Sequence, residues 1–169
     1  MSLNIESKKD LENLTLTFSS EFDAPVERVW QIWEDPRQLE RWWGPPTYPA
    51  TFVRHEFVPG GRASYYMTSP EGDKFWGWWE IQAVDAPNTF VFTDGFADDN
   101  GDPVDDVAPP TETVVTLEDI GGRTRMTSVG KFSSLEGLQK QLDMGMVEGM
   151  TMALGQIPAI LEEQSAEVR

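Results

Sequence analysis

A few polar side chains in this sequence have the chemistry to orient or polarise a bound molecule. Arg62, Tyr65, Tyr66 and Arg125 fall in segments that are predicted to be strands, whose geometry can direct side chains into a pocket. In an apolar cavity such groups can hold a carbonyl or a phenol and assist a cyclisation. His55 is the single histidine, and lone histidines are more often structural than catalytic. The spacing alone does not show that these groups converge.

The sequence lacks the short motifs that mark common catalytic and nucleotide-binding sites. HExxH, G-x-S-x-G, the P-loop and G-x-G-x-x-G are all absent, and with no cysteine there is no thiolate ligand or thiol nucleophile. A metal site at His55 would need carboxylates beside it, whereas Arg54 and Glu56 point to the other side of a strand. We therefore expect neither a metal nor a cofactor.

The acidic stretch DGFADDNGDPVDD, within a predicted loop over residues 94–110, resembles a calcium loop only in part. If Gly101 is aligned with the invariant glycine of an EF-hand, Asp98 and Asn100 fall correctly. Phe96 and Val107 then stand where the first aspartate and the closing glutamate are required. The prediction is a solvated loop with an Asn-Gly turn, with a weak cation site as the alternative.

The stretch KFWGWWEI, residues 74–81, carries more aromatic surface than one strand face can bury. We predict that one alternating set points inward: Phe75, Gly77, Trp79 and Ile81. Gly77 would leave room for another group to approach closely. Trp76 and Trp78 would then be covered by a loop, a neighbour or a dimer partner. Tryptophan in a packed core is the commoner outcome, and a cavity wall is the alternative.

The periodicity of the chain predicts the elements that position these residues. A strand is expected within residues 11–22, a helix at 23–33 and a second short helix that begins at Pro36. Six strands separated by Gly, Pro, Asn and Asp follow, and a single long helix is expected over 133–164. One curved antiparallel sheet of about seven strands around this helix would bury both elements, which is an α+β architecture.

The predicted C-terminal helix has a stripe of small residues, Gly145, Gly149 and Ala153, at four-residue steps. Glycine inside a helix costs about 1 kcal/mol relative to alanine, so it needs a reason. Close packing of the helix on the sheet is one reason. Room for a bound molecule, with the neighbouring methionines as adaptable walls, is the other.

Composition indicates the class of protein. With 169 residues we expect a single domain over 1–169, with its core at about 14–163. The net charge of −16 argues against nucleic acid and against anionic membrane surfaces as partners. No apolar run is long enough to span a membrane, and the N-terminal residues lack the apolar centre of a signal peptide. We expect a cytoplasmic protein.

Several strings, in their order and spacing, resemble one known superfamily. They are FDAPVERVWQIWEDPRQLERWWGP, EFVPGGRASYYM, GWWEI, VFTDGFADDNGDP, GGRTRMT and MGMVEGM. Over about residues 14–163 the chain resembles the SRPBCC (START/Bet v 1-like) superfamily, in the branch named for activators of the heat-shock protein 90 ATPase. The resemblance implies a helix-grip fold with a cavity between the sheet and the C-terminal helix. It implies no fixed catalytic set.

Three functions follow as hypotheses. The first is binding of a small, mostly apolar or aromatic molecule, without catalysis. The second is a co-chaperone-like interaction module linked to the stress response, including a homodimer through exposed tryptophans, and the third is an enzyme of the polyketide cyclase/aromatase type. The candidate cavity residues are Trp43, His55, Tyr65, Met67, Phe75, Trp79, Phe92, Arg125, Met146, Gly149 and Met150.

Overall fold

The alternating segments form a nine-stranded antiparallel sheet in a computed structural model that describes residues 5–104 and 109–167. The strands are β1 (Ile5–Asp10), β2 (Thr15–Phe22), β3 (Ala50–His55), β4 (Arg62–Thr68), β5 (Lys74–Asp85), β6 (Thr89–Ala97), β7 (Pro103–Val104), β8 (Thr111–Asp119) and β9 (Thr124–Lys131). They pair in the order β1-β2-β9-β8-β6-β5-β4-β3, with the short β7 against β6.

The sheet has two strands more than the sequence predicts, and β6 runs further than expected. β1 has the sequence IESKKD, whose polar side chains are largely exposed, so it has no hydrophobic alternation and is defined by its backbone pairing with β2. Residues 94–97, predicted as loop, continue β6 opposite Trp76–Trp79 of β5. This extension matters because it places Asp94 on a strand.

Five helices accompany the sheet in the described part of the chain: α1 (Val26–Glu34), α2 (Pro36–Leu39), α3 (Leu135–Asp143), α4 (Met146–Leu154) and α5 (Ile157–Glu167). The prediction of one unbroken C-terminal helix is wrong in detail. Gly145 has φ +85°, a left-handed conformation that ends α3, and Pro158 has no N–H to bond the carbonyl of Leu154. Gly145 therefore lies between helices, whereas Gly149 and Ala153 remain on α4.

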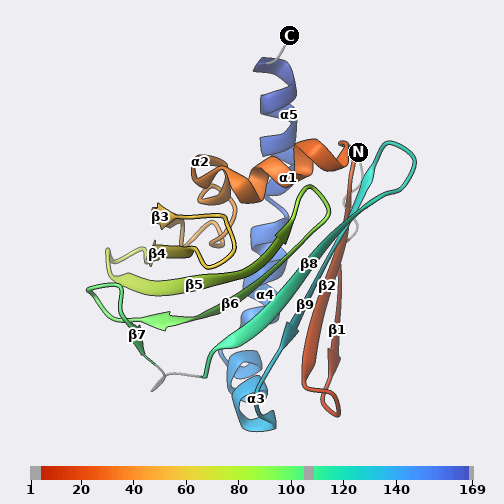
Figure 1. Cartoon of the computed structure of the whole chain (residues 1–169). Coiled ribbons are helices and arrows are strands. Elements are labelled where there is room, and N and C mark those ends of the chain that lie inside the picture. The colour runs from red at the N-terminus through yellow and green to blue at the C-terminus, as the bar shows by residue number, and fades with distance from the viewer. Residues whose placement is uncertain (1–4, 105–108, 168–169) are drawn as a thin grey trace.

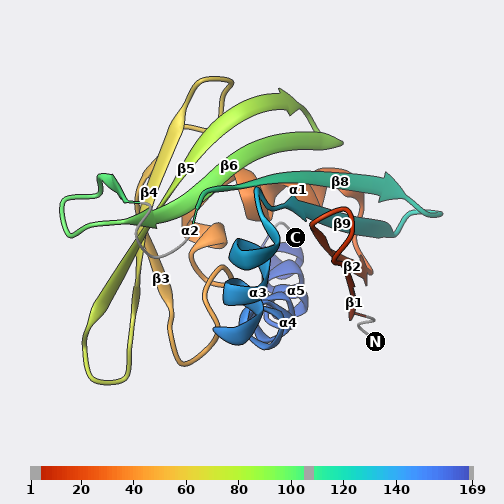
Figure 2. The same cartoon turned by 90° about the horizontal axis from the view of Figure 1, so that it is seen from below.

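The sheet curves around the C-terminal helices, which is the helix-grip arrangement of an α+β fold. Figure 2 shows the sheet arched over α3 and α4, and Figure 1 shows these two helices crossing its concave side, with α5 continuing past α1 beyond the end of the sheet. Helices α1 and α2 lie at one end of the sheet, where Val29, Trp30 and Trp33 of α1 are buried as their helical spacing predicts. The core lies between the sheet and these helices.

Arg28 fastens the end of the C-terminal helix to α1. The residue is 9% exposed, and its guanidinium donates to the Gln38 side chain and to the carbonyl of Ile160, both at 2.9 Å. A third bond, at 3.3 Å, goes to the side chain of Gln31. Since a buried charged donor serves acceptors on α1, α2 and α5, this residue ties α5 to the rest of the fold.

We expect Arg28→Met to lower the free energy of unfolding by about 1.5–3 kcal/mol, because acceptors lose a charge-assisted bond while the apolar stem is kept. Urea unfolding of both proteins measures the change. Arg54→Met is the matched control, since Arg54 is 52% exposed and pairs with Glu56 at the surface. Equal effects of the two substitutions would show that water replaces the bonds of Arg28.

Candidate functional site

A cavity of about 330 Å³ lies between the concave face of the sheet and helices α3 and α4. Its walls come from β2, β4, β5, β6, β8 and β9, from the turn after α2, and from the helices. The size falls in the range of small-molecule sites in proteins. Most lining side chains are apolar, with methionine prominent on the helical side: Met144, Met146 and Met150. A curved sheet and a broken helix thus leave an open interior.

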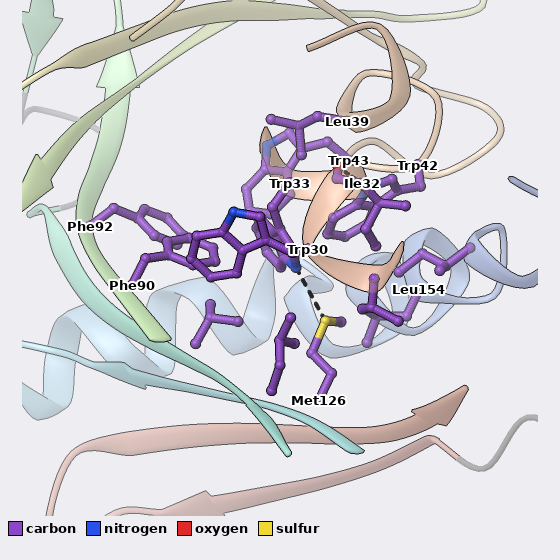
Figure 3. Packing of buried hydrophobic residues seen from close by; sticks show 14 of the residues in the cluster. Trp30, Ile32, Trp33, Leu39, Trp42, Trp43, Phe90, Phe92, Met126 and Leu154 are labelled. Carbon is purple, nitrogen blue, oxygen red and sulfur yellow. Dashed lines mark hydrogen bonds between the residues drawn. The ribbon is translucent and has the colours of Figure 1, made fainter. Parts of the chain in front are cut away.

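Tryptophans from α1 and from the turn after α2 form one wall of the cavity. Trp33 packs edge-on against Trp42 and Trp43, at ring-centroid distances of 4.7 and 5.9 Å (Figure 3). The indole of Trp33 donates to the sulfur of Met126 at 3.2 Å, and that of Trp42 to the carbonyl of Ile32 at 3.0 Å. These bonds fix two of the indoles that line the cavity.

Tyr65 reaches into the cavity because Gly77, opposite it on β5, has no side chain. A Cβ at Gly77 would lie 2.5 Å from the Tyr65 ring, so the ring occupies the space that the glycine leaves, as the sequence predicts for this position. The ring also stacks on Phe52 at 4.9 Å. The indole N–H groups of Trp43 and Trp79 lie near the Tyr65 hydroxyl and have no hydrogen-bond acceptor in the described structure.

Asp94 places a carboxyl group in this apolar interior. On β6 it faces Trp79 of β5 and Thr111 of β8, and it lines the cavity. Its side chain keeps some accessible surface at the cavity that it lines. Burial raises the pKa of Asp94 to about 7. Burial, and then the charge of Asp94, raise the pKa of Tyr65 as well.

Most of the candidate residues predicted from the sequence line the cavity. These are Trp43, Tyr65, Met67, Phe75, Phe92, Met146, Gly149 and Met150. Phe75 does so at the rim: it is 55% exposed and lies near Tyr48, with 6.1 Å between ring centroids. The expected inward face of β5 therefore holds for Gly77, Trp79 and Ile81, while Phe75 lies too near the strand end to be covered.

Three candidates lie elsewhere. Trp79 is fully buried behind the lining and stacks on Phe92 at 4.4 Å. The Nε2 atom of His55 is 2.9 Å from the carbonyl oxygen of Trp33, its ring stacks on Phe57, and burial lowers its pKa. Arg125 bonds Glu21 at 3.1 Å on the neighbouring strand β2. His55 thus packs as a structural residue, and Arg125 is engaged away from the cavity.

The outward-facing aromatics of β5 are covered by neighbouring strands of the same sheet. Trp78 lies over Gly95 of β6, where a Cβ would be 2.8 Å from the indole nitrogen. Trp76 packs on Tyr66 at 4.9 Å, with Lys74 over the Tyr66 ring. The Arg62 side chain bonds Glu80 at 3.3 Å. Of the predicted polar set, only Tyr65 reaches the cavity.

Sequence reasoning missed Asp94 because it assigned residue 94 to the acidic loop. The signal was present: Phe90, Phe92, Asp94 and Phe96 alternate, so they share one strand face. An aspartate that alternates with aromatic residues is expected to be buried with them. Asp94 was instead grouped with the surface aspartates that follow it in the sequence.

The acidic loop gives no metal centre in the part of the chain that is described. Within residues 5–104 and 109–167, no group of three His, Cys, Asp or Glu side chains is arranged to hold a metal ion. Asp98 instead accepts from the backbone of Asn100 and Asp102. Residues 105–108, which belong to the predicted cation loop, lie outside the described residues. Across the same described ranges, no helix is long and apolar enough to cross a membrane.

Comparison with known proteins places these features in a family. Residues 23–162 match the family model described as activator of Hsp90 ATPase homolog 1-like protein. A solution structure of a protein from Arthrobacter aurescens is 54% identical, with 94% of this chain and 91% of that chain covered and a TM-score of 0.89. A crystal structure of a protein from Mycobacterium smegmatis is 51% identical, with 95% of this chain and 97% of that chain covered and a TM-score of 0.86.

A solution structure from Staphylococcus epidermidis is 27% identical over 95% of this chain and 94% of that chain, with a TM-score of 0.79. No curated protein matches the sequence significantly. The similarity therefore covers nearly the whole chain.

Proposed function

The chain belongs to the family of activator of Hsp90 ATPase homolog 1-like proteins, and on that premise we propose that it binds a small, mostly apolar or aromatic molecule between sheet and helices. The observation that carries the proposal is the cavity itself. A closely packed protein interior has few voids larger than a water molecule, whereas this one leaves about 330 Å³ open. An aromatic wall and a methionine wall suit a flat apolar guest.

Gly149 supports the same proposal. It lines the cavity from α4, and a Cβ added there would meet no atom within 4 Å. Close packing of the helix on the sheet therefore does not explain this glycine. A glycine that weakens a helix without easing a contact is accounted for by the space that it leaves for a ligand.

Binding of 2-methylnaphthalene tests the proposal. At 100 times its dissociation constant a ligand adds about 2.7 kcal/mol to stability, so the melting temperature should rise and the tryptophan emission should change. No shift with this probe, nor with a broad set of apolar and aromatic compounds, would contradict the proposal. The protein-interaction function, whose support is the family alone, would then be tested next.

Gly149→Phe is expected to weaken binding of 2-methylnaphthalene at least about tenfold, because the added ring occupies the cavity. Gly149→Ala is the matched control: its methyl group takes far less of the cavity, so it should weaken binding much less than the Phe ring, and it should raise the free energy of unfolding by about 0.5–1 kcal/mol through helix propensity. Calorimetric titration and urea unfolding measure the two effects. Unchanged affinity in the Phe variant would place the probe elsewhere on the protein.

The cyclase-type alternative has weaker support. Of the polar groups first considered for it, Arg62 and Arg125 are engaged by Glu80 and Glu21, and His55 by the backbone of α1. Tyr65 alone faces the cavity. We therefore propose binding as the function, with one domain formed by the strands and helices that surround the cavity.

A further inference from the structure

The ionisable groups of the cavity are all acidic. Of the described residues that line it, only Asp94 and Tyr65 can titrate, and none is a lysine, arginine or histidine. The remaining polar groups are uncharged, such as Thr113, Ser128 and Gln141. An anionic guest would meet a carboxylate and no compensating cation. A guest that donates a hydrogen bond would meet an acceptor.

Asp94 is available to such a guest. In the described structure the hydrogen bond that acts on its carboxylate comes from its own backbone N–H, and no other side chain donates to it, so most of its acceptor capacity is left for a guest. The strands on either side contribute uncharged residues opposite it, Trp79 and Thr111. Tyr65 on β4 is the one other titratable group that faces it from the cavity walls.

From this geometry, and resting on the proposed function, we propose that Asp94 and Tyr65 form the polar end of the cavity. They select apolar aromatic molecules that carry a hydrogen-bond donor, a hydroxyl or a protonated amine, and they reject molecules that carry a carboxylate. Asp94 accepts from the donor, and the Tyr65 hydroxyl lies on the same side of the guest. The aromatic and methionine walls hold the ring system.

The pKa of about 7 makes this selection depend on pH. At pH 8 the Asp94 carboxyl is mainly ionised, which favours an ammonium guest and opposes a carboxylate guest. At pH 5.5 it is mainly protonated, so both effects weaken. The affinity for an amine should therefore rise with pH, whereas the affinity for a carboxylate should fall.

Four probes with one ring system test the proposal by calorimetric titration: 2-methylnaphthalene, 2-naphthylmethanol, 2-naphthylmethylamine and 2-naphthoate. At pH 8 we expect the alcohol and the amine to bind the wild-type protein at least about tenfold more tightly than naphthoate. The affinity for the amine should fall about tenfold from pH 8 to pH 5.5, and that for naphthoate should rise.

Asp94→Asn preserves the shape of the side chain and removes the charge. In this variant the affinity for the amine should fall about tenfold, the affinity for naphthoate should rise, and the pH dependence of both affinities should vanish. Glu112→Gln is the control, because Glu112 is an exposed carboxylate of β8 that does not line the cavity. It should retain the wild-type order of affinities.

The outcomes separate this inference from the function on which it rests. If 2-methylnaphthalene binds but the order of the charged probes is the same in wild type and Asp94→Asn, the polar subsite is wrong and the binding function stands. If no probe binds either protein, both fail. An unchanged preference for the amine in Asp94→Asn, lost instead in Glu112→Gln, would assign the selection to surface charge.

Discussion

A Trp79→Ala variant should be less stable than the wild-type protein by about 3–5 kcal/mol, the largest loss that we expect from a single substitution in this chain. Trp79 is fully buried and contacts the rings of Trp33, Trp43 and Phe92. The space left by the indole cannot close easily, because these rings are held in place by their own neighbours. Urea unfolding at fixed pH measures the loss.

Phe75→Ala is the matched control for this experiment. Phe75 is an aromatic residue on the same face of β5, four positions away, but it is 55% exposed. The substitution should lower the free energy of unfolding by less than about 1 kcal/mol, since it removes little apolar area from the core. A similar loss for both variants would mean that strand propensity, and not packing around Trp79, determines the effect.

The second large effect concerns Asp94 and pH. Burial raises the pKa of Asp94 from its ordinary value of 3.8 to about 7, so the folded protein binds this proton more tightly than the unfolded chain does. Stability is therefore lost as the pH rises from about 4 to about 7, and it stays at the lower level above that range. Asparagine carries no such proton.

We expect Asp94→Asn to be more stable than the wild-type protein at pH 8, and its advantage should grow by about 2–3 kcal/mol between pH 5 and pH 8. Free energies of unfolding at several pH values measure this difference. Subtracting the two curves removes the contribution of the other acidic residues. Parallel curves would show that Asp94 titrates normally, with water entering the cavity to solvate it.

The sequence predicts the sheet and the wall of the cavity well, because both depend on hydrophobic alternation. Trp79 and Ile81 are inside, and Gly77 leaves space for Tyr65, as the pattern of β5 indicates. Family resemblance then supplies the helix-grip arrangement, which periodicity alone does not specify. The prediction fails where backbone interactions decide: β1 is polar, and Gly145 breaks a segment whose side chains fit a helix.

The polar end of the cavity is harder to predict, since it depends on which side chains converge in space. His55 and Arg125 have the right chemistry, but the carbonyl of Trp33 and the carboxylate of Glu21 engage them. Asp94 was hidden by its position beside surface aspartates. The alternation with Phe90 and Phe92 indicates its strand face, and the pairing of β6 with β5 and β8 gives its neighbours.

The interruptions of the C-terminal segment affect how quickly a guest can exchange. Helices α3 and α4 have nine residues each, which is too short to be stable in water alone, so each depends on its contacts with the sheet. A continuous helix would have to leave the sheet as one body. Separate short helices can detach one at a time, so we expect the residence time of a guest to follow this local opening and not global unfolding.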